Sequence, residues 1–243
     1  MCADATLVLY GNLTGRTVSL ADYLNKSYAL ELSHLGQKYG SQAPFPTTQY
    51  TTMSDVAVVT RLLLLNAPYL ARTVVRSARN MQLGDFKRGN FVMVGGPRAI
   101  PWEELFDKHL NFRVELDPER QVRVIRINSP IRGERPQYEN VVPKPGQPGG
   151  RGKLYSTVAL TTNLTCTGYS LLIRGTTGEA TEAAADYLTN SASSSRLAST
   201  LGVKANSKLT PFEILLESTT LGGNASSTEM VVYRLSQPEE MCR

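Results

Sequence analysis

Short apolar runs separated by turn residues divide the first half of the chain into alternating segments. Three runs are too short for independent helices and fit buried strands, namely 5–10, 73–77 and 91–94. Helical patterns lie between or after them, at 19–24, 54–67, 83–88 and from Pro101 onward. This β-α-β-α-β-α order predicts parallel strands joined by right-handed crossovers.

The strongest helical pattern begins at Ser54-Asp55, which is suited to cap a helix, and ends before Pro68. Its apolar positions, which include Val56, Val59 and Leu63, cover most of the helix circumference. A helix that is apolar on nearly all sides is normally enclosed by the rest of the protein. We therefore expect this helix to be well buried.

The second half of the chain begins with a different pattern. Apolar and charged residues alternate in 112–116 and 122–127 around a turn at 117–120, which predicts a hairpin with one wet face. Strands are expected at 155–160 and 169–174, a helix from Glu179, and a short helix at 194–201. Two closing strands, 212–216 and 230–235, predict an antiparallel edge.

Together these patterns predict one α/β domain that spans residues 1–243. Its expected fold is Rossmann-like or flavodoxin-like, with a mostly parallel sheet, helices on both faces, and an antiparallel hairpin and edge. Residues 143–152 are almost all Pro, Gly and basic residues, so we expect an exposed, mobile loop there.

Two glycine-containing turns follow predicted strands and precede predicted helices. The first contains Gly95, Gly96 and Arg98; the second contains Thr176, Thr177 and Gly178, with Thr181 in the helix that follows. If their strands are neighbours, both loops open at one sheet edge, where helix amides, an arginine and hydroxyls could bind a small anion. Alternatively, the glycines only permit tight turns and close helix packing.

A third segment, Asn128-Ser-Pro-Ile-Arg-Gly-Glu134, could complete the wall of this site. Asn128 could hold the turn through its amide, and Glu134 could pair with Arg98 or Arg132. The segment fits equally well a buried polar network without a functional role. The candidate ligand-binding residues are therefore Gly95, Gly96, Arg98, Asn128, Glu134, Thr176, Thr177, Gly178 and Thr181.

Composition narrows the chemistry that the chain can support. The 243 residues include three cysteines and two histidines without metal-ligand spacing, and no catalytic set is visible, so we expect neither a metal nor a cofactor. The net charge of +5 is spread out, and its densest group, from Arg132 to Lys153, fits a solvated loop better than a nucleic-acid contact. A Cys2–Cys242 disulfide and free terminal thiols both remain open.

The sequence shows neither a signal peptide nor an apolar run near the ~20 residues that a membrane span needs. Seven segments match those of a known domain in the same order: Leu7–Tyr10, Asp85–Arg98, Pro101-Trp102, Asn128–Glu134, Tyr138, Gly175–Ala184 and Pro211–Leu216. Through these segments the chain resembles an uncharacterised C-terminal domain, common in acidobacteria, of membrane-anchored or winged helix-turn-helix regulatory proteins. Ile100 and Ala180 depart from the asparagine and glycine usual in that family.

This resemblance implies a regulatory context but no mechanism. The leading hypothesis is a non-enzymatic sensory or ligand-binding domain for a small anionic ligand, on either side of a membrane. One alternative is an enzyme acting on a phosphorylated or nucleotide substrate, with Arg98 and Glu134 in its cleft. The other is an interaction module, able to form homo-oligomers through residues 143–152 or the closing edge strand.

Overall fold

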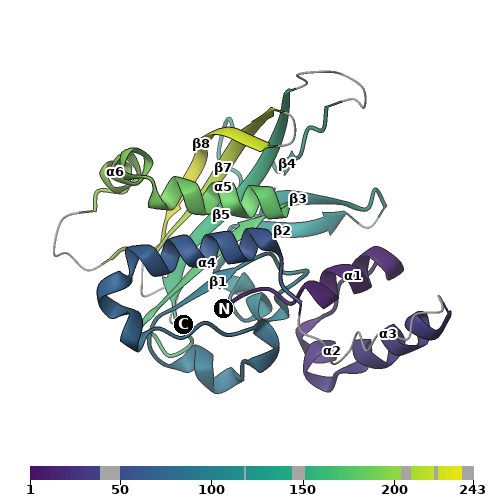
Figure 1. Cartoon of the computed structure of the whole chain (residues 1–243). Coiled ribbons are helices and arrows are strands. Elements are labelled where there is room, and N and C mark those ends of the chain that lie inside the picture. Colours follow the sequence, from purple (N-terminus) through teal and green to yellow (C-terminus); the bar gives the residue numbers. More distant parts are fainter. Residues whose placement is uncertain (39–49, 118, 144–150, 204–208, 222–223, 237–243) are drawn as a thin grey trace.

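The computed structural model describes residues 1–38, 50–117, 119–143, 151–203, 209–221 and 224–236. Sheet A has the strand order β1-β6-β5-β7-β8, and sheet B has the order β2-β3-β4 (Figure 1). The strands are β1 Phe91–Val94, β2 Phe112–Asp117, β3 Val122–Ile127, β4 Gln137–Glu139, β5 Arg151–Thr162, β6 Tyr169–Gly175, β7 Phe212–Leu221 and β8 Asn224–Leu235.

The helices lie mainly before β1 and between β6 and β7. The α-helices are α1 Ala5–Thr14, α2 Leu20–Asn25, α3 Ser27–Lys38, α4 Met53–Leu65, α5 Gly178–Thr189 and α6 Ser191–Thr200. Short 3-10 helices are η1 Ala67–Arg72, η2 Ala78–Asn80, η3 Leu83–Lys87, η4 Pro101–Leu105 and η5 Asp107–His109.

The prediction of a mostly parallel, Rossmann-like sheet is wrong. Within sheet A only β1 and β6 run parallel, while β6–β5, β5–β7 and β7–β8 are antiparallel. Both strand pairs of sheet B are antiparallel as well. The chain is therefore a mixed α/β protein with mostly antiparallel sheets, and the predicted hairpin and closing antiparallel edge are confirmed.

The predicted first strand is a helix. Asp4 caps α1 by accepting a hydrogen bond from the Thr6 amide, and Gly15 ends it in the left-handed conformation, with φ of 70°. Leu7 and Tyr10, one helical turn apart, are both buried. Short apolar runs do not separate strand from buried helix by pattern alone, and here the two caps decide the outcome.

The predicted second strand, 73–77, makes only an isolated bridge between Ser77 and Cys2. The N-terminus takes the place beside β1 instead. The Met1 ammonium donates to the Val92 carbonyl at 2.7 Å, and the Val94 amide donates to the Met1 carbonyl at 3.1 Å. The N-terminal residues therefore occupy the position beside β1 that was expected for the second strand.

Sheet A is covered on both faces. Helices α4, α5 and α6 pack on one face through Val58, Ala184 and Leu197, against sheet residues such as Ile173 and Ile214 (Figure 1). On the other face, one part of sheet A packs against α1–α3 and the 3-10 helices η2, η3 and η4, and another part packs against sheet B. Alternate residues of each strand serve the two faces, as the strand period requires.

Three further expectations concern the loops and termini. Most of the 143–152 segment lies outside the described residues, and its last two residues, Arg151 and Gly152, begin β5. Cys2 carries a free thiol, so the Cys2–Cys242 disulfide is absent. Cys166 is disulfide-bonded, and Cys242 lies outside the described residues. Among the described helices, none combines the length and the apolar character needed to cross a membrane.

Candidate functional site

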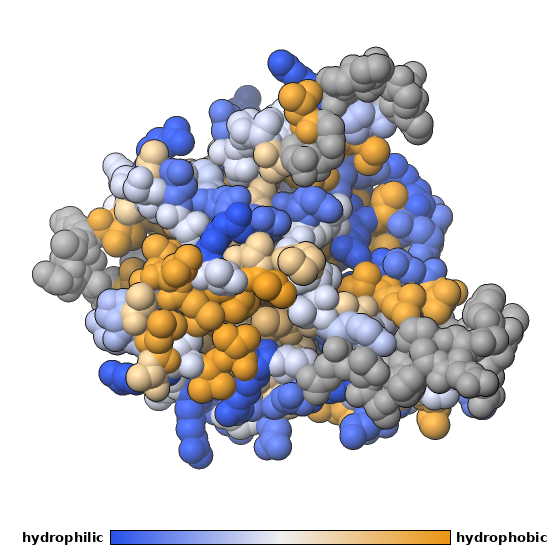
Figure 2. Space-filling view, in the orientation of Figure 1, coloured by the Kyte–Doolittle hydropathy of each residue, from blue (hydrophilic) through white to orange (hydrophobic). Residues whose placement is uncertain are grey.

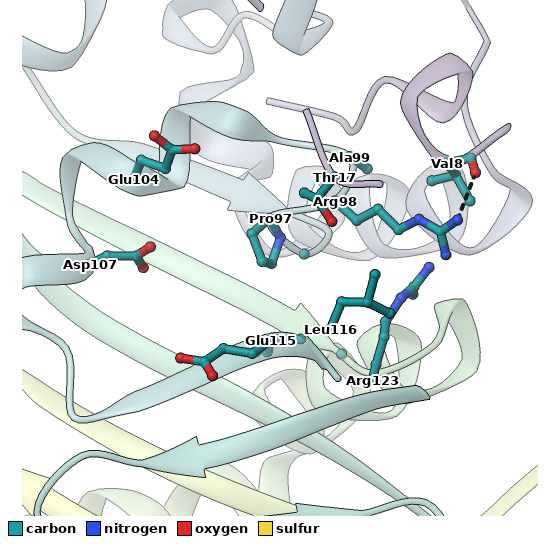
Figure 3. A pocket seen from close by; sticks show the side chains of 13 residues that line it. Val8, Thr17, Pro97, Arg98, Ala99, Glu104, Asp107, Glu115, Leu116 and Arg123 are labelled. Atoms are coloured by element: carbon teal, nitrogen blue, oxygen red, sulfur yellow. Dashed lines mark hydrogen bonds between the residues drawn. The ribbon is translucent and has the colours of Figure 1, made fainter. Parts of the chain in front are cut away.

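A cleft of about 360 Å³ opens where the loop after β1 faces the β2–β3 hairpin of sheet B. The α1 helix and the end of β6 close two more of its sides (Figure 3). The residues that line it are Val8, Thr17, Gly96, Pro97, Arg98, Ala99, Glu104, Asp107, Val114, Glu115, Leu116, Arg123 and Gly175.

The two glycine loops predicted to open at one sheet edge do lie side by side. Strands β1 and β6 pair in parallel, with Val94 opposite Ile173, so both chains leave the sheet at the same end. Gly96 and Gly175 both line the cleft, and a Cβ on Gly96 would come within 3.4 Å of the Gly175 carbonyl. Gly95, with φ of 123°, forms the turn itself.

Arg98 extends from this loop along the side of α1. Its Nη2 donates to the Val8 carbonyl at 3.2 Å and to Asn12 Oδ1 at 2.7 Å, while its buried Nε has no hydrogen-bond partner among the described residues. Gly11 makes room for the guanidinium, since a Cβ there would lie 2.8 Å from Arg98 Cζ. Burial lowers the pKa of Arg98.

Arg123 reaches the same end of the cleft from β3, and the two guanidinium groups converge in Figure 3. Its Nη1 donates to the Thr176 carbonyl at 2.9 Å. Burial and the charge of Arg98 both lower the pKa of Arg123. Within the described part of the chain, neither arginine has a carboxylate within salt-bridge distance.

The sequence-based hypothesis missed Arg123, although the strand period contains a signal for it. Arg123 shares its side of β3 with Ile125 and Ile127, which are buried. Burying an unpaired charge is costly, so an arginine on the apolar side of a strand has to extend its guanidinium to a polar site or to the edge of the hydrophobic core. The alternation predicted for this hairpin assigned every charged residue to the wet face, which is wrong for Arg123.

Carboxylates lie at the opposite end of the cleft (Figure 3), on Glu104, Asp107 and Glu115. Glu104 accepts a hydrogen bond from the Leu20 amide at 2.9 Å, and Glu115 accepts one from Arg126 at 2.8 Å. Burial raises the pKa of Asp107, and the charge of Glu115 acts in the same direction. The cleft is therefore bipolar, with cations at one end and acids at the other.

The hydroxyl residues of the second loop serve the fold rather than the cleft. The Thr176 hydroxyl donates to the Tyr155 carbonyl at 2.8 Å, and the Thr177 hydroxyl caps α5 by accepting from the Ala180 amide. Thr181 donates to the Thr177 carbonyl at 3.0 Å. Gly178 lies against Ser54 of α4, so the start of α5 faces another helix. None of the four residues is among those that line the cleft.

The predicted third wall also lies elsewhere. The Asn128 side chain donates to the Leu110 carbonyl at 3.0 Å, which fixes the loop after β3. Glu134 pairs with Arg234 of β8 rather than with Arg98 or Arg132. Of the nine predicted site residues, the cleft therefore contains Gly96 and Arg98, with Gly95 forming the adjoining turn.

Behind the acidic end of the cleft lies a buried charge network. The Arg174 guanidinium, 1% exposed, donates to the Phe112 carbonyl at 2.8 Å and to the Thr157 hydroxyl at 3.1 Å. Glu103 Oε2 and Asp107 Oδ1 each lie 3.9 Å from Arg174 Nη1. Burial raises the pKa of Glu103 well above its usual value, because desolvation outweighs the attraction of Arg174.

The buried Glu103 predicts a specific pH dependence of stability. A carboxyl group whose pKa is raised by folding stabilises the native state at low pH and loses this contribution as pH rises through the folded pKa. Glu103→Gln should therefore gain stability over the wild type between pH 5 and pH 8, by on the order of 1–3 kcal/mol at the upper end. Urea unfolding across this range tests it, with Glu104→Gln as the neighbouring control. A difference independent of pH would contradict it.

Comparison of the chain with protein-family models, curated proteins and solved structures found no significant match. The function of the cleft is therefore argued from the geometry and charges of its own residues.

Proposed function

We propose that the chain is a ligand-binding domain whose cleft holds a small anion between Arg98 and Arg123. One observation carries this proposal: two half-buried arginines meet at one end of the cleft, and neither has a carboxylate partner among the described residues. Two like charges in a partly desolvated site repel each other, and an anion placed between them removes that repulsion. A carboxylate or phosphate also matches the fork of donors on each guanidinium.

The binding site is largely formed before any ligand arrives. Hydrogen bonds to Val8, Asn12 and Thr176 hold the two arginines, so little side-chain freedom remains to be lost on binding. A rigid site of this kind favours binding and sensing.

The acidic end of the cleft adds a criterion for the ligand. Asp107 and Glu115 would repel a second anionic group and would attract an ammonium group or a hydroxyl donor. We infer that the preferred ligand is short and carries its negative charge at one end only. Amino acids and phosphorylated amines have this charge distribution, whereas dicarboxylates of similar length do not.

The enzyme alternative required Arg98 and Glu134 together in one cleft. Glu134 instead pairs with Arg234 and is not among the residues that line the cleft. The function that the described residues support best is therefore binding without a named reaction.

Arg98→Met and Arg123→Met should each weaken anion binding by roughly tenfold to a hundredfold, because a hydrogen bond to a charged group contributes about 1.5–3 kcal/mol. Isothermal titration calorimetry with inorganic phosphate, acetate, glycine and phosphoethanolamine measures this directly. Arg120→Met is the matched control, since Arg120 lies in the same hairpin and pairs with Glu139 outside the cleft. Wild-type affinity in both cleft variants, or no binding of any probe by the wild type, would refute the proposal.

Gly11→Ala provides a second test that leaves both arginines in the sequence. Alanine is favoured over glycine inside a helix by about 1 kcal/mol. The new methyl group would nevertheless occupy the space of the Arg98 guanidinium, whose flexible side chain would move aside. The variant should therefore fold at least as well as the wild type and bind the same probes more weakly.

A further inference from the structure

Helix α4 is apolar on two opposite faces, but only one of them is covered. Val58, Val59 and Leu62 pack into the core against sheet A and α5. Met53, Val56 and Leu64, at positions i, i+3 and i+11 on the outer face, remain exposed. The sequence pattern predicts burial on nearly all sides, but the residues that the structure describes pack against only one side. A helix of this composition indicates that something else covers the second face.

The exposed apolar surface continues beyond the helix. Figure 2 shows an apolar area over α4 and the segment that follows it. Several of its side chains are exposed to an unusual degree, such as Leu64 at 72% and Val74 at 71%. We name this surface the outer apolar face; it consists of Met53, Val56, Leu64, Leu65, Tyr69, Leu70, Val74 and Val75. Contiguous apolar surface of this kind marks an interaction site, whereas single exposed leucines do not.

Positive charge accompanies this face. Residues 53–90 carry six basic and two acidic side chains. The bases are Arg61, Arg72, Arg76, Arg79, Lys87 and Arg88, and the acids are Asp55 and Asp85. Three of the bases are paired: Arg61 with Glu182 and Asp186, Arg76 with Asp85, and Arg79 with Asp4. The positive charge beside this face therefore comes from Arg72, Lys87 and Arg88. The Arg76–Asp85 ion pair of 3.1 Å ties η3 to the segment 73–77. Lys87 and Arg88 follow directly, and both are exposed, as is Arg72.

This charge distribution disfavours a second copy of the chain as the partner. A two-fold contact places the same surface patch on both subunits, so Arg72, Lys87 and Arg88 would meet their own copies across the interface. Protein-binding hot spots are also enriched in Trp, Tyr and Arg and depleted in Leu and Val. The outer apolar face is mostly leucine and valine, and it contains a single tyrosine.

An anionic lipid surface fits both properties. Leucine and valine insert into the boundary between headgroups and acyl chains, and tyrosine is favoured at that depth. Each nearby Lys or Arg adds about 1 kcal/mol of attraction to anionic headgroups. We propose that the outer apolar face, flanked by Arg72, Lys87 and Arg88, docks the protein on the surface of an anionic membrane. This site is separate from the cleft and does not depend on ligand binding there.

Vesicle co-sedimentation tests the proposal. The wild type should bind phosphatidylcholine vesicles that contain phosphatidylglycerol, and bind pure phosphatidylcholine vesicles far more weakly. Leu64→Ser/Leu65→Ser should reduce binding by at least tenfold, because two aliphatic side chains no longer leave water. Arg72→Gln/Lys87→Gln/Arg88→Gln should reduce it on the order of a hundredfold at low salt. Leu24→Ser/Leu30→Ser is the matched control, since both leucines are exposed on α2 and α3.

The outcomes are separable because all substituted residues are exposed and the variants should remain folded. Full binding by the serine pair with loss in the charge variant would reduce the effect to adsorption of a basic protein and overturn the proposal. Absence of vesicle binding by the wild type would also overturn it. If the wild type does not bind vesicles but forms a dimer in light scattering, and Leu64→Ser/Leu65→Ser abolishes this dimer, the outer apolar face binds a second copy of the chain instead.

Discussion

Arg174→Met will lower the free energy of unfolding by about 3–5 kcal/mol, the usual effect of breaking a buried charge network from one side. The substitution leaves the Phe112 carbonyl and the Thr157 hydroxyl without the hydrogen bonds that they accept from Arg174. It also removes the cation that faces Asp107. For a chain of this length, the loss corresponds to a fall in Tm of roughly 6–20 °C.

Urea unfolding monitored by circular dichroism provides the measurement. Arg126→Met is the matched control, because Arg126 is a strand arginine with a side chain 52% exposed and an ion pair to Glu115. Exposed pairs of this kind contribute 0.2–1 kcal/mol at most, on the order of a tenth of the Arg174 effect. Equal stability of the two variants would show that the buried network contributes little to folding.

Phe86→Ala will have a comparable effect, about 3–5 kcal/mol, through a cavity in the aromatic cluster. Phe86 is fully buried in η3, and its ring centroid lies 4.9 Å from Trp102, 5.3 Å from Phe91 and 6.3 Å from Phe106. Aromatic pairs contribute about 0.5–1.5 kcal/mol each beyond their buried area. In the wild type, the contacts of Phe86 also hold η4 against the sheet, and with it the wall of the cleft at Glu104. The substitution removes these contacts.

Leu83→Ala is the control for this substitution, since Leu83 lies in the same short helix with 47% of its surface exposed. Its effect should stay within about 0.5–1 kcal/mol. Thermal unfolding in a calorimeter compares the two variants. A Phe86→Ala protein that unfolds at the same temperature as Leu83→Ala would show that the cluster rearranges to fill the cavity.

The sequence predicted the elements that local pattern determines. The hairpin β2–β3, the closing pair β7–β8 and helix α5 follow from alternation, turn residues and capping, and all three are confirmed. Strand direction depends on pairing between distant segments, and there the prediction was wrong. One clue was overlooked: only six residues join β5 at Thr162 to β6 at Tyr169, too few for a parallel crossover.

The candidate site was predicted in part, for a similar reason. The neighbouring loops at Gly96 and Gly175 follow from the strand–glycine–helix pattern, which survives even though the sheet is mostly antiparallel. Arg123 comes from sheet B, and no local pattern places sheet B opposite the β1 loop. Thr176, Thr177 and Thr181 were assigned to a ligand, but their hydroxyl groups form hydrogen bonds with backbone groups around them.

The single parallel pair, β1–β6, has a consequence for when the cleft comes into existence. Its two strands are about eighty positions apart, with all of sheet B and β5 between them. Contacts that close so long a loop carry a large entropic cost and form late relative to hairpins. The cleft is complete only when this pair has formed, since Gly96 and Gly175 lie directly beyond it. If the cleft binds an anion as proposed, its occupancy and the completion of the fold are thermodynamically linked. The bound anion would then stabilise the strand pair with the largest sequence separation among the described strands.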